Sequence, residues 1–214
     1  MSFGTRNGWA PARFPVDSGA GRRLREWLDA EEGGLDAVGL DLGGADLSYG
    51  DFSASWFTDA KLAGVKLAGA ELYRSDGQGA DLTEADLTGA SLVRVNLDDA
   101  ILRNATLEGA DLVKASLHGV DASGAGCRGT RFMGSSLLGA DFRGADLSDA
   151  VFDENSFQVK VDEETKLEGA SGSVFGPVTF VREGVSRELS GSELQQWTRD
   201  HGGEIRVLGI QANR

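Results

Sequence analysis

Cysteine, histidine and proline are all scarce in this sequence. Its 214 residues include one cysteine, Cys127, two histidines, His118 and His201, and three prolines. One cysteine excludes a disulfide framework within the chain and indicates a reducing compartment. No group of histidines and cysteines has the spacing of zinc ligands. We therefore expect no metal site and no cofactor.

Long hydrophobic runs are missing too. No stretch approaches the roughly 20 apolar residues of a membrane-spanning helix, and the first residues lack the apolar core of a secretory signal. These absences predict a cytoplasmic protein with no membrane partner. Positive charge is also in deficit, because 34 acidic residues outnumber 21 basic ones and leave a net charge of −13. Direct binding to nucleic acid is therefore disfavoured, and basic protein surfaces are the expected partners.

Glycine is abundant, and it accompanies a repeat of five residues. Counting in fives from Leu42 to Phe157 gives 24 positions, of which leucine or phenylalanine occupies 21. The exceptions are Gly77, Ala122 and Cys127, where we expect thin spots in the packing. A small residue, most often alanine, stands two positions before each large one.

This period of five matches neither a helix, at 3.6 residues, nor a strand, at 2.0. The chain must therefore turn once in every repeat and direct one large and one small side chain inward each time. Such a pattern predicts an all-β coil wound around a narrow core, in a central domain spanning residues 40–157.

At this point the sequence resembles the pentapeptide repeat family, whose consensus is Ala-Asp/Asn-Leu-X-X. The segments ADLSY, ADLTE, ADLTG, ADLVK and ADLSD match it almost letter for letter. The resemblance implies a right-handed quadrilateral β-helix, a solenoid with four pentapeptides in each coil. On that geometry 24 repeats make about six coils, or a rod about 29 Å long.

Different patterns flank the repeats. Residues 1–39 contain a predicted capping helix that begins at Ser18, runs to about Glu32, and stops at Gly33-Gly34. Residues 158–173 lose the repeat, and a small α+β appendix completes the segment 158–214. We expect a hairpin that turns at Glu183-Gly184, a helix whose capping box is Ser190 with Glu193, and a last strand after Gly203. This appendix could cap the last coil, fold back on the rod or form a dimer contact.

The repeat region carries most of the negative charge, with 19 acidic and 9 basic residues between positions 40 and 157. The resemblance implies a DNA mimic, since Qnr-type and MfpA-like members imitate duplex DNA and bind DNA gyrase. The alternative is that aspartate before the central leucine serves the turn through local hydrogen bonds. With twenty residues per coil, Asp41, Lys61 and Asp81 would stack, which favours fold stabilisation. The candidate acidic surface comprises Asp41, Asp46, Asp81, Asp86, Asp121, Asp141 and Asp146.

The same stacking places Tyr73, Val93, Val113 and Met133 in one outward column, beside Arg74, Arg94 and Lys114. An outward apolar stripe is unusual on a soluble protein and often marks a contact site. Three interpretations remain open: the chain's own C-terminal segment covers the stripe, a partner or second protomer binds it, or it is simply exposed. Trp56 and Tyr49 also point outward, and we expect them to pack under the N-terminal helix.

No residue pattern indicates catalysis. Cys127 fills a core position, both histidines read as solvated polar residues, and the glycines follow the repeat. The leading hypothesis is a non-catalytic protein that binds and modulates or protects DNA gyrase or another type II topoisomerase. The alternative is a general interaction scaffold that uses the stripe or the C-terminal appendix.

Overall fold

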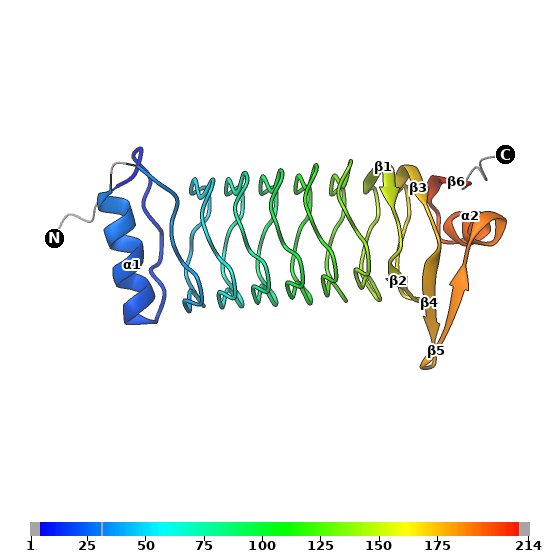
Figure 1. The fold of residues 1–214 in the computed structure, drawn as a ribbon, viewed down its shortest axis with the longest axis horizontal. Helices are drawn as coiled ribbons and strands as arrows, with labels where there is room; N and C mark the ends of the chain where they lie inside the picture. Colours follow the sequence, from blue (N-terminus) through cyan, green and yellow to red (C-terminus); the bar gives the residue numbers. More distant parts are fainter. Residues whose placement is uncertain (1–4, 31, 210–214) are drawn as a thin grey trace.

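Backbone bridges join residues about twenty positions apart along most of the chain. The computed structural model describes residues 5–30 and 32–209, and a stack of similar coils fills its length (Figure 1). Asp41 forms a parallel bridge with Lys61, and Lys61 forms one with Asp81. Columns of such bridges begin at Asp36, Asp41, Asp46 and Asp51. We number the four sides of the rod after these columns, so that side 1 begins at Asp36, side 2 at Asp41, side 3 at Asp46 and side 4 at Asp51. Each side includes the turns that follow its bridges. Four pentapeptides therefore complete one coil, as predicted; the hand of the coil stays a prediction.

Each pentapeptide ends in a tight turn that explains the period of five. In the first ADL repeat region, the amide of Ala45 donates to the carbonyl oxygen of Leu42 at 3.1 Å. The residue before the last in such a turn has a positive φ, as for Gly44 at 71° and Asp59 at 55°. Glycine adopts this conformation without strain, whereas most other residues do so at a cost. The high glycine content thus follows from one demanding position in every repeat.

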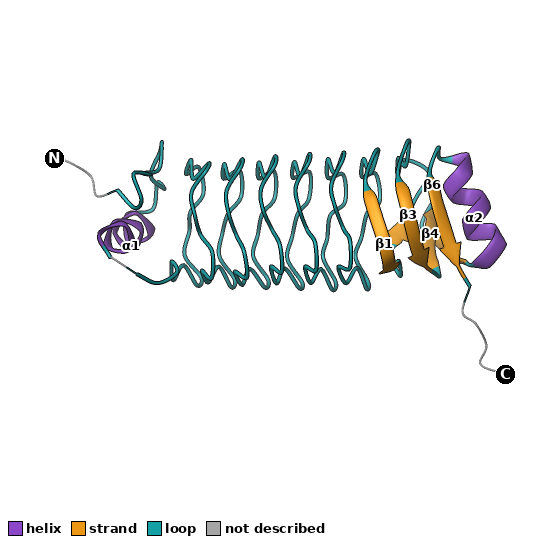
Figure 2. Ribbon diagram, turned by 90° about the horizontal axis from the view of Figure 1, so that it is seen from above, coloured by secondary structure: helices purple, strands orange, loops and turns teal. Residues whose placement is uncertain are grey.

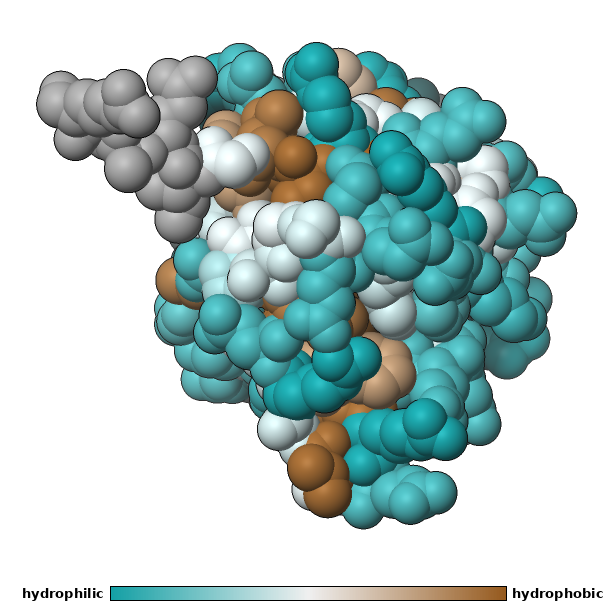
Figure 3. All heavy atoms as spheres, turned by 90° about the vertical axis from the view of Figure 1, so that its right-hand side faces the viewer, coloured by the Kyte–Doolittle hydropathy of each residue, from teal (hydrophilic) through white to brown (hydrophobic). Residues whose placement is uncertain are grey.

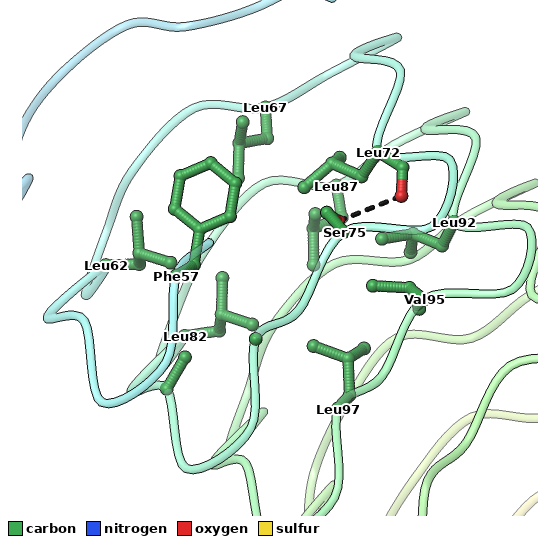
Figure 4. Close-up of a pocket in the computed structure, with 12 residues that line it drawn as sticks. Phe57, Leu62, Leu67, Leu72, Ser75, Leu82, Leu87, Leu92, Val95 and Leu97 are labelled. Carbon is green, nitrogen blue, oxygen red and sulfur yellow. Dashed lines mark hydrogen bonds between the residues drawn. The ribbon is translucent and has the colours of Figure 1, made fainter. Parts of the chain in front are cut away.

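The interior is a continuous column of stacked side chains. The central leucines and phenylalanines are buried from Leu42 to Phe157, and the rings of Phe132 and Phe152 stack at 5.3 Å. Gly77 interrupts the column, and a cavity of about 20 Å³ lies beside it (Figure 4). Leu97 and Leu82 line this cavity. The thin spot expected at Gly77 is confirmed, while those at Ala122 and Cys127 stay predictions.

An aromatic cluster closes the N-terminal end. Helix α1, Ser18–Asp29, buries Leu24, Trp27 and Leu28. Trp27 stacks on Phe52 at 5.3 Å, and Trp9 contacts the same ring edge-on at 5.4 Å. The predicted lid on the first coil is therefore confirmed. Its boundaries were wrong, because Asp17 caps the helix through the amide of Ala20 at 2.7 Å, and the helix ends before the glycine pair.

The solenoid does not stop at Phe157. Lys160 bridges to Asp141 and Lys166 bridges to Asp146, while Leu167 and Ala170 continue the buried column. The predictions that residues 158–173 lose the repeat and that the rod has six coils were therefore wrong. On side 4, for example, successive coils pair at Asp51, Glu71, Ser91, Asp111, Arg131, Val151, Ser171 and Glu204. Counting in fives misses this part of the solenoid, because Lys160 lies nineteen residues after its bridge partner Asp141 and not twenty.

Regular strands and a helix form the C-terminal end (Figure 2). The elements are β1 Val151–Ser156, β2 Lys160–Val161, β3 Ser171–Phe175, β4 Val178–Arg182, β5 Val185–Leu189, α2 Gly191–Asp200 and β6 Glu204–Leu208. One sheet has the order β1-β3-β6 and the other β2-β4-β5. All neighbours are parallel except β4 and β5, which form the predicted hairpin. Strands β3, β4 and β6 thus extend the coil registers, and α2 lies beyond the last of them.

The C-terminal segment therefore caps the end of the rod and does not fold back along it. Hydrophilic residues cover most of this end face, with small apolar patches between them (Figure 3). The predicted capping box was wrong: Ser190 precedes α2 without a side-chain hydrogen bond, and Glu193 pairs with Arg187 instead. Neither helix in the described ranges is long and apolar enough to cross a membrane.

Candidate interaction surfaces

The seven candidate acidic residues lie on two adjacent sides of the rod. Side 2 carries Asp41, Asp81, Asp121 and Asp141, and side 3 carries Asp46, Asp86 and Asp146. The predicted charge ladders are confirmed, because Lys61 lies between Asp41 and Asp81. Lys66 lies in the same way between two aspartates of side 3. These sides are therefore mixed in charge.

Ion pairs neutralise much of this acidity. Four of the seven carboxylates have a basic partner: Asp46 with Lys66 at 4.0 Å, Asp121 with Arg103 at 2.6 Å, Asp141 with Arg143 at 2.7 Å, and Asp146 with Lys166 at 3.8 Å. Opposite charges on neighbouring strands attract and support the stack. These four carboxylates therefore stabilise the fold, and their charge is less available to a partner.

The same carboxylates also hold the turns. Oδ1 of Asp81 accepts from the amide of Thr83 at 3.0 Å, and that of Asp121 accepts from the amide of Ser123 at 3.1 Å. Partial burial opposes ionisation of Asp121, but hydrogen bonds from Ser123 and Arg103 outweigh it and hold the pKa of this carboxyl below its ordinary value. Aspartate before the central leucine is thus explained by local turn chemistry on sides 2 and 3.

Side 1 is different, because no lysine or arginine occupies its outward positions from Asp36 to Gly139. In the N-terminal half of the rod, this side carries Asp59, Asp76, Asp98 and Asp99. Among the described residues, no basic side chain lies within ion-pair distance of any of the four; Asp98 accepts instead from Ser116 and from the amide of His118. These donors are neutral, so they do not offset the negative charge of the Asp98 carboxylate. Side 1 is therefore the uncompensated acidic surface of the rod.

The candidate surface inferred from sequence did not include side 1. The consensus motif marks the ADL repeats, none of which lies on this side. The signal was present, since sorting the charges by their position within each twenty residues separates the sides. Asp59 and Asp99 also occupy the turn position with positive φ, at 55° and 59°. The repeat consensus does not specify an acidic residue there.

The apolar stripe is confirmed as a column on side 4. Tyr73 is 39% exposed, and Val93, Val113 and Met133, which follow it in the column, are half-buried. The C-terminal segment lies at the end of the rod, so the interpretation in which it covers the stripe was wrong (Figure 1). The stripe residues stand two positions after the bridge residues of side 4. On the other three sides, the same position is mostly occupied by polar or small residues. The stripe is therefore a specific feature of side 4 and remains open to solvent.

Two outward aromatic residues do not pack under α1, contrary to expectation. Tyr49 is 76% exposed, and its ring lies over Gly69 in the next coil. Trp56 is half-exposed on side 1. The aromatic rings that pack on Trp27 of α1 include those of Trp9 and Phe52, of which Trp9 lies outside the repeat.

The potential catalytic groups are dispersed. Burial, with a smaller effect from Asp146, raises the pKa of the Cys127 thiol to about 12, so it is a poor nucleophile. His118 lies exposed on side 1, whereas the ring of His201 packs on Trp197 at 4.4 Å. These three residues occupy different parts of the rod and form no joint site.

The chain is similar to known repeat proteins. A family model described as pentapeptide repeats matches eight copies, over residues 57–92, 90–125 and 110–149. No curated protein sequence matches the chain. The matched segments lie within the coils in which the bridges follow a strict spacing of twenty, from Asp36 to Val151.

Solved structures of pentapeptide repeat proteins are similar to part of this chain. HetL, a pentapeptide repeat protein involved in heterocyst differentiation regulation from the cyanobacterium Nostoc sp. strain PCC 7120, is 26% identical, with a TM-score of 0.51 over 66% of this chain and 74% of that one. Rfr23 from the cyanobacterium Cyanothece 51142 is 24% identical, with a TM-score of 0.40 over 62% of this chain and 91% of that one. Trypsin-treated QnrB1, a plasmid-mediated fluoroquinolone resistance protein, is 18% identical, with a TM-score of 0.31 over 65% of this chain and 90% of that one.

Proposed function

Because the chain belongs to the pentapeptide repeat family, we propose that it is a non-catalytic protein that binds a basic partner protein through side 1 of its solenoid. The partner is a protein that otherwise binds DNA, and DNA gyrase or another type II topoisomerase is the first candidate. The single buried thiol supports a reducing, cytoplasmic location. Since fold alone does not fix function, the proposal depends on the charge of one surface.

The observation that carries the proposal is the uncompensated charge of side 1. Asp59, Asp76, Asp98 and Asp99 lie within two coil steps, which is about 10 Å along the rod. One strand of duplex DNA presents about three phosphates over that length. The rod as a whole carries less charge than a duplex, but this part of side 1 matches the charge density of one strand. A groove that binds a DNA strand would therefore attract it.

A rigid rod suits this role. Each coil repeats the backbone of the one before, so the carboxylates of side 1 are held at fixed spacing and lose little freedom on binding. Electrostatic complementarity of this kind raises the association rate and weakens with added salt. A general scaffold that uses side 4 is the alternative function, favoured by the exposed apolar stripe.

A supercoiling assay tests the proposal. Purified gyrase is given relaxed plasmid and increasing amounts of the protein, with and without a quinolone. We expect the protein to inhibit supercoiling or to reduce quinolone-dependent cleavage. If neither activity changes at any ratio of protein to enzyme, gyrase is excluded as the partner, and the same assay is then run with the other type II topoisomerases.

Matched variants assign the effect to side 1. Replacing all four aspartates of side 1 with asparagine removes four charges but keeps the hydrogen-bond acceptors, and asparagine tolerates the positive φ at positions 59 and 99. The control variant carries Asp41→Asn, Asp46→Asn, Asp81→Asn and Asp86→Asn and loses the same charge from sides 2 and 3. We expect only the first variant to lose its effect on the enzyme. An equal loss in both would mean that net charge acts and that side 1 has no special role.

A further inference from the structure

Side 4 bears three parallel columns of different chemistry. Where the chain crosses this side, the column of bridges comes first; it is acidic at Asp51, Glu71 and Asp111, with Ser91 between the last two and Arg131 after them. The apolar stripe follows it, and a basic ridge of Arg74, Arg94 and Lys114 follows the stripe. The chain crosses side 4 in the same direction in every coil, because all bridges between coils are parallel. The three columns therefore keep their order along the rod.

The basic ridge has no partner in its own chain. Within the part of the chain that the structure describes, no carboxylate lies within ion-pair distance of Arg74, Arg94 or Lys114, and Arg74 only stacks over the ring of Tyr73 at 5.3 Å. All three residues hold a positive φ, between 55° and 60°. Glycine fills the equivalent turn position in many repeats of the other three sides, such as Gly64 and Gly69, without strain. Three long basic side chains in consecutive coils are therefore not explained by the needs of the fold.

We propose that side 4 binds a second copy of this chain, side by side, about a twofold axis parallel to the long axis of the rod. This axis reverses the order of the columns in the second copy. The acidic column of each copy then faces the basic ridge of the other, and the apolar stripes meet between them. A twofold axis perpendicular to the rod keeps the order and places like charges opposite each other.

Glu71 and Arg74 define the contact most sharply. Both belong to the same coil, and a twofold axis along the rod preserves height, so Glu71 of each copy lies opposite Arg74 of the other. Neither residue has an ion-pair partner among the described residues. Asp111 faces Lys114 in the same way, although it also pairs with Arg131 of its own chain at 2.8 Å.

The size of the surface sets the expected strength. The stripe spans three coil steps, about 14 Å. The area that a stripe of this length can bury is smaller than the roughly 800 Å² per partner of a standard stable interface. We therefore expect a dimer with a dissociation constant in the micromolar range that weakens with added salt.

Sedimentation equilibrium of the full chain across micromolar concentrations tests the proposal. We expect the wild-type chain to dimerise and Val113→Glu to be monomeric. Glu108 occupies the equivalent slot on side 3 of the same coil, so the slot accepts glutamate without loss of the fold. Thr88→Glu adds the same charge on side 3 and should dimerise like the wild type. A monomeric wild-type chain, or a dimer that tolerates Val113→Glu, would overturn the proposal and leave the stripe to a different partner or to solvent.

Charge reversal tests the direction of the axis. Glu71→Lys alone and Arg74→Glu alone should each weaken dimerisation by about tenfold. The double variant exchanges the two charges and should restore wild-type affinity, because each residue again faces its opposite. If the double variant is as weak as either single one, the twofold axis does not run along the rod.

Discussion

The side chain of Gln195 closes the free edge of the last strand by pairing with the backbone next to Ile205. Its Nε2 donates to the carbonyl oxygen of Ile205 at 2.7 Å, and its Oε1 accepts from the amide of Val207 at 2.9 Å. Strand β6 lies at the edge of its sheet, where unpaired groups could template association with another chain. One glutamine on α2 thus replaces the hydrogen bonds that a further coil would supply.

Gln195→Ala should destabilise the cap by about 1–3 kcal/mol, because it leaves a carbonyl and an amide of β6 without partners. We expect a lower midpoint in urea unfolding and a new tendency to form end-to-end oligomers in size-exclusion chromatography. Gln196→Ala is the control, since the side chain of Gln196 bonds with Asp200 on the exposed face of α2 and with no other described residue. If the two variants unfold and elute alike, Gln195 does not protect the edge.

Gly77→Ala should stabilise the protein by roughly 0.5–1 kcal/mol, through a less flexible unfolded chain and added apolar burial. The new Cβ would lie 3.0 Å from Cδ2 of Leu97, which borders the cavity and can move into it (Figure 4). Gly79→Ala is the contrast: Gly79 has a φ of 66°, and its Cβ would lie 2.5 Å from Oδ1 of Asp59. We expect it to destabilise by about 1 kcal/mol or more. Urea midpoints that move in the same direction for both variants would contradict this account.

The sequence predicted the coils well because one rule determines them. Each repeat needs an inward leucine or phenylalanine such as Leu87, and this requirement leaves its mark at every fifth residue. The ends follow other rules. At Lys160 a single missing residue shifts the register, although the backbone still pairs with Asp141. Counting in fives cannot follow such a shift, whereas backbone pairing between coils tolerates it.

The acidic surface was harder to predict because the consensus does not mark the side of the rod that lacks basic residues. Asp81 fits the motif and holds the amide of Thr83, so the turn explains it. Asp98 and Asp99 occupy positions that the motif leaves open, and they lie on the side that carries no basic residue between Asp36 and Gly139. The sequence contains this asymmetry, but it becomes visible only when the coil length is known and the four sides can be separated.

The stability of the rod should fall in acid, and Asp121 should contribute to that fall. Its carboxyl has a lowered pKa in the folded state, because hydrogen bonds from Ser123 and Arg103 outweigh the effect of partial burial. Its contribution is therefore complete above the unfolded pKa of about 3.9 and is lost as the pH falls through the lower folded value. The difference in melting temperature between wild type and Asp121→Asn should shrink as the pH falls below about 4.

Asp86→Asn serves as the control for that titration. It removes one charge from side 3, and its carboxylate has no ion-pair partner among the described residues, accepting only from the amide of Thr88 at 3.1 Å. Its melting temperature should follow that of the wild type more closely through the acid range. A difference between wild type and Asp121→Asn that stays constant down to low pH would show that Arg103 and Ser123 do not stabilise the ionised carboxyl.

Cys127 should be inert in the folded protein. The thiol is fully inside the core, and burial raises its pKa to about 12, so almost no thiolate exists near neutral pH. An aromatic disulfide reagent at mild alkaline pH should find no reactive thiol in the native wild-type chain and one thiol after unfolding in guanidinium. Ser136→Cys places a second thiol on exposed side 1 and should react at once in the native state. Rapid native labelling of the wild-type chain would mean that the coil around Cys127 opens readily, and the core would then be looser there than its burial indicates.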